Sequence, residues 1–395
     1  MKNRFILILT IVYIMCIFLS SISYAEEYDG YDAYNLYAKV IEAGEEEDYT
    51  DEYASYKIQR LKVEILDSRF KGERFDIIYY LEDGINTRLP LYDTFKVGDK
   101  LYVYGIYEDG VLKVEAASYY DKTPWIIVIA GIYAVLIAIM GGKKGLRAIV
   151  GLAITIVLIF KVLVPAILAG YNSILITILI CSLVILITFI IISGFNKKTW
   201  VAIIGTVAGV IMAGLIGGIF GYGMRLTGIN EHARMISVAI PEEREMISFK
   251  DIMLSAIMIS ALGACMDVGM SISSSISEIK EKKPELKAKE LIKSGMNIGK
   301  DVMGTMTNTL ILAYVGSAML CILLYNVNGF DLSFILNSED ITVEVLKSLS
   351  GSIGLVCTIP LTALFGGIII GNSKIDTKKI DEKENEEIPV NYFKG

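Results

Sequence analysis

Residues 248–317 read SFKDIMLSAIMISALGACMDVGMSISSSISEIKEKKPELKAKELIKSGMNIGKDVMGTMTNTLILAYVGS. This stretch holds two apolar segments that flank a loop rich in lysine. Asp267 lies near the loop end of the first segment, and Asp301 lies at the start of the second. Ionisable groups inside a bilayer are costly and usually have a function. The search for a functional site therefore begins with these two carboxylates.

Helical spacing places further polar side chains beside both aspartates. Asp267 and Ser271 share one face of the first segment, and Asp301, Thr305 and Asn308 share one face of the second. Hard cations prefer oxygen ligands of these kinds. We therefore expect these five residues to bind an ion or a small-molecule substrate.

Both aspartates also have a structural explanation. Asp267 could cap a neighbouring helix or pair with Lys300. Asp301 could lie in headgroup water as an acid at the start of a helix. The pattern favours the structural explanation for Asp301 and leaves both explanations open for Asp267.

The apolar residues of the chain are concentrated between residues 124 and 371. Of 395 residues, 54% are hydrophobic. A helix needs about 20 apolar residues to span a bilayer. The candidate runs are 124–140, 148–169, 173–193, 199–222, 251–273, 302–325 and 346–371. We predict an α-helical polytopic membrane domain of about seven transmembrane helices over residues 123–372.

The segment before these helices has three parts. Residues 1–25 have the charged start, apolar middle and small-residue end of a signal peptide, which an uncleaved anchor would also fit. Residues 26–52 are acidic, rich in tyrosine and weakly periodic, which predicts a flexible leader. Residues 53–122 alternate apolar and polar residues between Gly-Asp and Asp-Gly turns, which predicts about five strands in an all-β, OB-like barrel. Residues 373–395 form a charged tail.

Several tyrosines of the predicted barrel have two interpretations. Tyr79, Tyr80, Tyr102 and Tyr104 could pack the barrel core, or they could stack on a ligand at its surface. We favour packing in the core.

Loop charges predict the orientation in the membrane. Lysine and arginine concentrate in loops 141–147, 194–198 and 275–300 and in the tail after residue 371, whereas the alternate loops are uncharged or balanced by glutamate. The positive-inside rule therefore places these loops and the C-terminus in the cytoplasm. Residues 26–122 then lie outside, as the signal sequence also predicts.

A stripe of small residues repeats every fourth position in the fourth apolar run. Such stripes let helix backbones approach closely. We favour packing within one chain over a homo-oligomer interface or a sliding surface. The stripe consists of Gly205, Gly209, Ala213, Gly217 and Gly221.

The composition argues against several classes of function. The net charge of −7 comes largely from residues 26–122 and the tail, so no surface suits nucleic acid. His232 is the only histidine, which excludes metal sites built from several histidines. We interpret His232 as a surface residue. We predict no catalytic residue, metal or cofactor, and we expect a protein that is not an enzyme.

Two sequence segments resemble the YibE/F-like family of bacterial multi-span membrane proteins. The first is LGACMDVGMSIS at 262–273, and the second is SGMNIGKDVMGTMTNTLILAYVG at 294–316. This resemblance implies a multi-pass protein of the bacterial cell membrane and a permease-like role.

Three functions remain for comparison. The first is a permease or transporter with a polar site between the fifth and sixth spans. The second is a non-transporting membrane scaffold, or a sensor whose outer β-domain binds an envelope partner or ligand. An intramembrane aspartyl protease is disfavoured, because Cys265 and Met266 precede Asp267 where Tyr-Asp or Gly-x-Gly-Asp is expected. The expected partners are the lipid bilayer, a small-molecule or ion substrate and a second copy of the chain.

Overall fold

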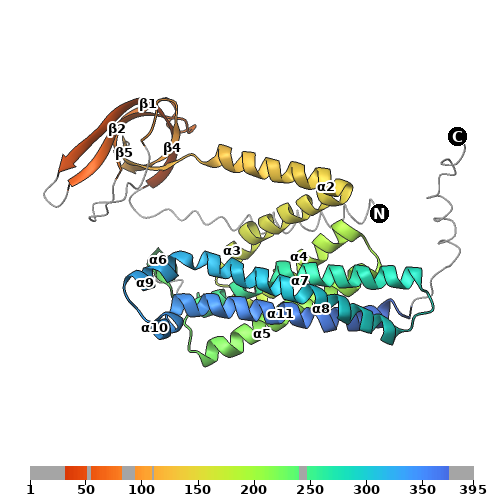
Figure 1. Cartoon of the computed structure of the whole chain (residues 1–395). Coiled ribbons are helices and arrows are strands. Elements are labelled where there is room, and N and C mark those ends of the chain that lie inside the picture. Colours follow the sequence, from red (N-terminus) through yellow and green to blue (C-terminus); the bar gives the residue numbers. More distant parts are fainter. Residues whose placement is uncertain (1–31, 51–54, 82–93, 109–110, 240–246, 373–395) are drawn as a thin grey trace, which may run out of the picture. The chain divides into compact units, whose positions relative to one another are not determined.

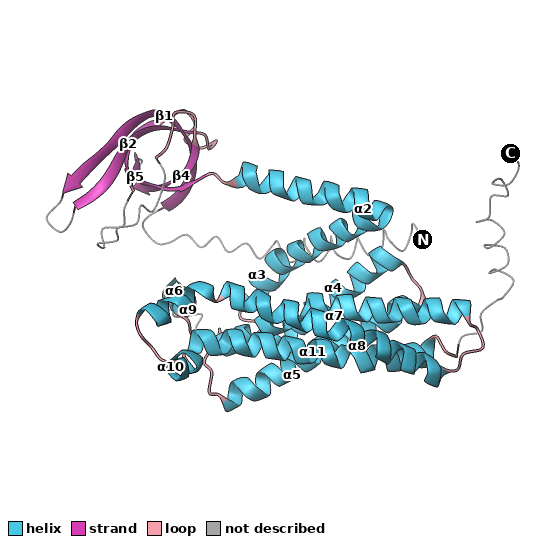
Figure 2. Cartoon of the chain, viewed as in Figure 1, coloured by secondary structure: helices cyan, strands magenta, loops and turns pink. Residues whose placement is uncertain are grey.

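The computed structural model describes residues 32–50, 55–81, 94–108, 111–239 and 247–372. The chain forms two compact units that divide between Ile137 and Ala138, inside a helix, rather than at residue 123. The first unit contains the strands, and the second contains most of the helices (Figures 1 and 2). The predicted signal peptide and charged tail lie outside the described residues.

The first unit contains a closed five-stranded barrel. Its order is β1-β2-β3-β5-β4, and β1 closes the barrel by pairing antiparallel with β4. β3 and β5 are parallel at Ile78 and Ala116. The strands are β1 (Asp32–Thr50), β2 (Ser55–Ile65), β3 (Arg74–Tyr80), β4 (Lys100–Glu108) and β5 (Val111–Tyr120).

Strand β1 corrects one prediction from the sequence. The segment 26–52 was expected to be a flexible leader, yet most of it forms this 19-residue strand. Leu36, Ala38 and Val40 alternate into the barrel core and are at most 4% exposed. Register shifts follow at Val40/Glu42 and Ala43/Glu46. These shifts interrupt the period of two in the acidic half of the strand, which is why the pattern appeared weak.

The barrel tyrosines divide between the core and the surface. Tyr79 is 5% exposed and packs edge-on against Phe95. Tyr80, Tyr102 and Tyr104 are 43%, 37% and 40% exposed. The expectation that all four tyrosines pack the core is therefore correct for Tyr79 alone.

The helices follow the barrel along the chain. They are α2 (Thr123–Leu158), the π-helix η1 (Ile159–Leu163), α3 (Val164–Leu168), α4 (Ser173–Ser193), α5 (Lys197–Gly223), α6 (Glu231–Ala239), α7 (Phe249–Lys282), α8 (Ala288–Ser317), α9 (Met319–Val327), α10 (Leu332–Asn337) and α11 (Glu339–Ile369).

The described residues contain five helices that are long and apolar enough to cross a membrane. A sixth is counted if α8 and α9, which meet at a bend of 53°, form one span. The first helix, Thr123–Leu168, has 46 residues, whereas about 20 suffice for a bilayer. Gly142 interrupts it with φ 51° and ψ −133°, inside the predicted loop 141–147. Seven spans therefore remain a prediction, which requires that the two halves of this helix count separately and that α8 and α9 form one span.

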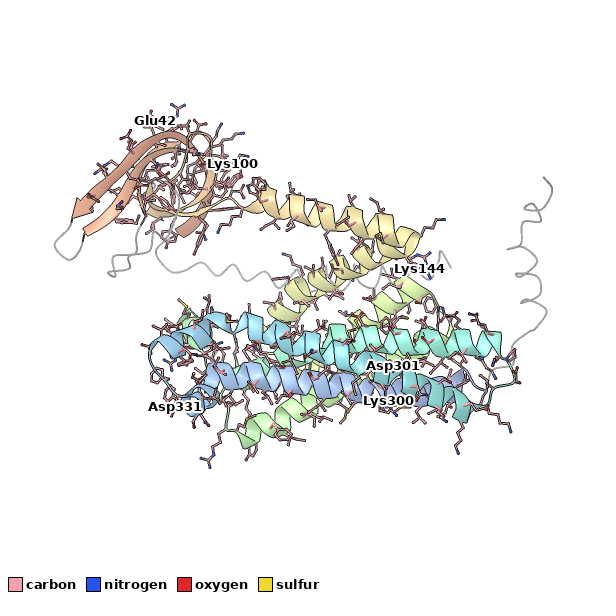
Figure 3. All side chains as sticks on the ribbon, in the orientation of Figure 1. Glu42, Lys100, Lys144, Lys300, Asp301 and Asp331 are labelled. Atoms are coloured by element: carbon pink, nitrogen blue, oxygen red, sulfur yellow. The ribbon has the colours of Figure 1, made fainter. Side chains whose placement is uncertain are left out.

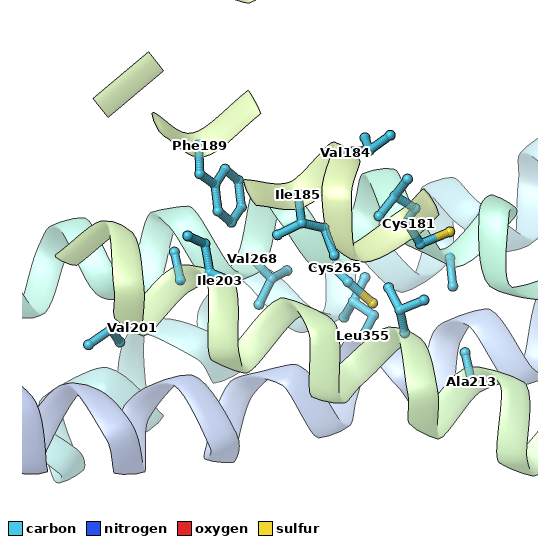
Figure 4. Close-up of a cluster of buried hydrophobic side chains, with 14 of the residues drawn as sticks. Cys181, Val184, Ile185, Phe189, Val201, Ile203, Ala213, Cys265, Val268 and Leu355 are labelled. Carbon is cyan, nitrogen blue, oxygen red and sulfur yellow. The ribbon is translucent and has the colours of Figure 1, made fainter. Parts of the chain in front are cut away.

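The core of the helical unit lies where α4, α5, α7 and α11 meet. Figure 4 shows Cys181 and Ile185 from α4 packed near Cys265 and Val268 from α7. Leu355 of α11 belongs to the same cluster and is fully buried.

The small-residue stripe of α5 packs inside the chain. A Cβ added at Gly205 or Gly209 would overlap Thr362 or Thr358 of α11. A Cβ at Gly217 would lie 2.8 Å from Ile257 of α7. The glycines therefore let α5 approach α11 and α7 closely, in line with the packing interpretation.

Candidate functional site

Asp267 lies near the middle of α7, between Phe249 and Lys282. The sequence placed it close to the loop end, because the apolar run stops at residue 273. The structure extends α7 through the serine-rich residues that follow, to Lys282. The expected position near the end of the helix is therefore wrong.

The face of α7 that contains Asp267 is small and polar along its length. We call Ala256, Ser260, Gly263, Asp267 and Ser271 the α7 polar face. Gly263, Asp267 and Ser271 are exposed, and a Cβ added at Gly263 would meet no atom within 4 Å. The opposite side of α7 is buried in the core. That side includes Ile257, Met258, Ala261, Leu262, Cys265, Val268 and Ile272.

α8 has a polar face of its own. Leu291, Gly295 and Gly299 are buried, and the two glycines pack against side chains of α7 and α11. The opposite side is exposed in the described structure. We call this exposed set, Asp301, Gly304, Thr305 and Asn308, the α8 polar face.

The start of α8 corrects the structural explanation of Asp301. The helix begins at Ala288, after the Lys287 N–H donates to Glu290 at 2.8 Å. Asp301 therefore lies more than three turns inside the helix, next to Lys300 (Figure 3), and it is not a first-turn acid. The sequence placed the helix start too late because the segment before Asp301 contains several lysines.

The five predicted site residues all lie on these two exposed faces. Among the described residues, Asp267 forms no hydrogen bond or ion pair, so neither helix capping nor pairing with Lys300 explains it. Thr305 Oγ1 donates to the Val302 carbonyl at 3.0 Å, so this hydroxyl is bound to its own helix. The Asp267 carboxylate is therefore left available to a ligand.

A large pocket of about 560 Å³ lies at one end of α7. Residues of α6, α7, α11 and the α8–α9 bend line it. Ala256 lines the large pocket and also belongs to the α7 polar face. The pocket therefore opens onto the same side of α7 as Asp267.

Charged side chains line the large pocket. Glu344 and Lys347 of α11 form a half-buried ion pair at 2.6 Å. Glu231, His232 and Asp340 also line the pocket, and none of the three pairs with another described residue. His232 is exposed, as the sequence predicted for a surface residue, but the sequence did not show that it lines a pocket. In the sequence, only the amphipathic pattern around His232 could have indicated that this segment packs against other helices.

A fourth carboxylate of the large pocket, Glu339, has a structural role. Glu339 accepts hydrogen bonds from the Thr227 N–H at 2.7 Å, the Thr227 hydroxyl at 2.6 Å and the Gly228 N–H at 2.7 Å. It therefore ties the segment after α5 to the start of α11. We do not count it among the groups that are free to bind a ligand.

A small pocket of about 150 Å³ adjoins the large one at Glu344. Its other lining is mostly apolar, with Tyr314 and Ser348 as polar exceptions. Ser348 is 6% exposed, and its hydroxyl has no hydrogen-bond partner among the described residues. This buried hydroxyl is available to a bound polar group.

The described residues contain no group of three or more His, Cys, Asp or Glu side chains arranged to hold a metal ion.

The family comparison covers the helices that carry these features. Residues 129–372 match the YibE/F-like protein family, which is more than half of the chain. The chain belongs to the YibE/F-like family. No curated protein and no solved structure matches it significantly. In this YibE/F-like protein, both polar faces and both pockets lie in the matched segment, whereas strands β1 to β5 precede it.

Proposed function

We propose that this protein is a permease that moves a small cation or cationic solute along the α7 polar face. The observation that carries the proposal is the continuity of this face, from Ala256 in the large pocket to the unpaired carboxylate of Asp267. The two residues are 11 positions apart, or about 16 Å along the helix. Small and hydroxylated side chains between them leave room for a solute.

The α8 polar face adds polar groups at nearly the same depth as Asp267. Asp267 lies 16 residues before Lys283, and Asp301 lies 14 residues after Lys287, on the two sides of the same helical hairpin. At 1.5 Å per residue, the two carboxylates lie within about 3 Å of the same depth along the hairpin. Thr305 and Asn308 then supply further oxygen ligands. The proposed cation site therefore consists of Asp267, Ser271, Asp301, Thr305 and Asn308.

We infer that a second copy of the chain covers the α8 polar face. Lipid tails cannot satisfy the amide of Asn308 or the carboxylate of Asp301, so exposure of these groups to hydrocarbon would be costly. A facing copy could supply hydrogen-bond partners at the same depth.

We further infer the type of barrel, the number of spans and the orientation in the membrane. Five strands in the order β1-β2-β3-β5-β4 support an OB-like barrel. The break at Gly142 supports seven spans. The lysine-rich α7–α8 hairpin supports a cytoplasmic position for that loop and for the C-terminus, with the barrel outside the cell membrane. We propose no enzymatic activity.

A ligand screen tests the proposed cation site. Purified full-length protein is heated with sodium, potassium, magnesium, calcium or small organic amines. A ligand that binds only the folded state raises the unfolding temperature. We expect one class of cation to do so, and we expect Asp267→Asn to remove the shift. The matched control is Glu285→Gln, which removes an exposed carboxylate from the α7–α8 loop.

The screen also has a result that contradicts the proposal. If no cation stabilises the protein, or if Asp267→Asn and the control respond as the unmodified protein does, Asp267 is not part of a cation site.

A second candidate function is a membrane sensor or scaffold whose barrel binds an envelope partner or ligand. The exposure of Tyr102 and Tyr104, two positions apart on β4, favours this alternative because such rings can stack on a ligand. Deletion of residues 26–120 separates the two functions. A permease keeps residual flux without the barrel, whereas a sensor loses its output.

A further inference from the structure

A third pocket lies at the opposite end of α7 from the large pocket. It has a volume of about 440 Å³ and lies between the start of α5, the end of α7 and Ile370 after α11. We call it the lysine pocket, because Lys197, Lys198 and Lys280 line it. It shares no lining residue with the large pocket. The proposed cation path therefore does not account for it.

Lys280 is a buried cation in this pocket. The residue is 5% exposed, and its Nζ donates to the carbonyls of Pro284 at 2.7 Å and Leu286 at 2.8 Å. No carboxylate of a described residue lies within 4.0 Å of this Nζ. Two carbonyls leave one ammonium hydrogen without an acceptor and the positive charge without a counterion. Buried charges are normally paired, so the pocket is suited to an anion.

The other charged residues of the lysine pocket also give a net positive charge. Lys197 and Lys198 add two positive charges, and Glu281 is the one acidic residue in the lining. Ser277 Oγ donates to Glu281 at 3.3 Å, which occupies part of that carboxylate. The lining therefore keeps a net positive charge.

The start of α5 adds backbone donors. Asn196 accepts a hydrogen bond from the Thr199 N–H at 2.9 Å and so caps the third position of the helix. The N–H groups of Lys197 and Lys198 precede it, and a helix supplies no internal acceptor for such positions. The positive end of the dipole of this 27-residue helix also lies at these residues, which line the pocket. Free N–H groups at a helix N-terminus, joined by lysines, are a recurrent arrangement for phosphate binding.

We propose that the lysine pocket binds a phosphate group, either as inorganic phosphate or as the headgroup of an anionic lipid. The backbone N–H groups of Lys197 and Lys198 and the ammonium groups of the three lysines supply the donors. Trp200 lies in the first turn of α5 and is 45% exposed, which favours a lipid as the source of the phosphate group. Tryptophan is enriched at the depth of lipid headgroups.

The experiment measures the unfolding temperature of full-length protein in a neutral detergent. The probes are inorganic phosphate, with chloride at equal ionic strength as its control, and dihexanoyl phosphatidylglycerol, with dihexanoyl phosphatidylcholine as its control. The test variant is the double substitution Lys197→Gln and Lys198→Gln. The matched control is Lys282→Gln with Lys283→Gln, which removes the same charge from exposed positions just beyond Lys280. Lys280 is left unchanged because its loss could unfold the loop.

We expect phosphate, phosphatidylglycerol or both to stabilise the unmodified protein, while chloride and phosphatidylcholine do not. The test variant should bind at least about tenfold more weakly, since loss of one hydrogen bond to a charged group has an effect of that size. The control variant should stay within about twofold, because screened surface charges contribute little. A response to both phosphate probes indicates a general phosphate site, and a response to the lipid alone indicates a headgroup site. The proposal fails if neither probe stabilises the protein, or if both variants weaken binding equally.

Discussion

Ala256 and Asp267 lie on the same face of α7, with Ala256 in the wall of the large pocket and Asp267 in the middle of the helix. This relationship joins a cavity to an unpaired carboxylate within one membrane helix. The side of α7 that faces the core carries large apolar residues instead. The proposed transport path therefore follows the small and polar side of the helix.

The first prediction is that water reaches the α7 polar face. In a background without the native cysteines, Gly263→Cys should react at least about tenfold faster with a charged thiol reagent than Ala261→Cys, because only an ionised thiol in contact with water reacts well. Gly263 has open space around it, and Ala261 is fully buried two residues away. Rates measured in lipid vesicles decide the matter. Equal rates would show that lipid or protein covers this face.

The second prediction concerns the packing of α5 on α11. Gly209→Ala should lower the free energy of unfolding by about 1–3 kcal/mol, because its Cβ would overlap Thr358 Oγ1 and lie 2.9 Å from the Gly354 carbonyl. Gly263→Ala is the matched control. It enters open space and should be neutral or stabilising by up to about 1 kcal/mol, since alanine favours the helix. Thermal unfolding in detergent compares them, and similar losses would contradict the packing described.

The third prediction concerns pH and the barrel. The Tyr37 hydroxyl donates to Asp121 Oδ2 at 2.5 Å. This bond raises the pKa of Tyr37 to about 12 and lowers the pKa of Asp121. The Asp121 contribution to stability is present above the carboxyl's unfolded pKa of about 3.9 and is lost as the pH falls through its lower folded pKa. The Tyr37 contribution is present below its unfolded pKa of about 10 and is lost as the pH rises towards 12.

Amide hydrogen exchange of strand β1 in the full-length protein measures this effect. Tyr37→Phe should weaken protection at neutral pH and should make it less dependent on pH below 4. Thr123 also donates its N–H to Asp121 at 3.0 Å, so part of the dependence should remain. An unchanged profile in Tyr37→Phe would show that the bond does not stabilise the barrel.

Much of the fold follows from patterns in the sequence. Apolar runs of sufficient length indicate the long helices, and alternation of apolar and polar residues indicates strands β2 to β5. The stripe of small residues at every fourth position indicates a close helix contact, because glycine leaves room for Thr358 and Thr362. These features depend on local periodicity, which one sequence displays.

Other features depend on contacts that the sequence does not display. Strand β1 is held by pairing with β2 and β4 across two register shifts, so its own alternation is interrupted. The polar ends of α7 and α8 remain helical beyond their apolar runs, which moved Asp267 and Asp301 away from the predicted helix ends. The large pocket brings His232 together with Asp340, which is distant in the chain. Only the three-dimensional structure shows that these two residues line one pocket.

The most direct test of the proposed permease is cation flux across vesicles that contain the purified protein. The cation that stabilises the protein in the ligand screen is loaded inside, and its release is followed with a selective indicator. We predict that Asp267→Asn lowers the rate of release at least about tenfold, while Glu285→Gln changes it by less than about twofold, because only Asp267 lies on the path. Flux that is unchanged in Asp267→Asn, or no flux above that of empty vesicles, would contradict the proposed function.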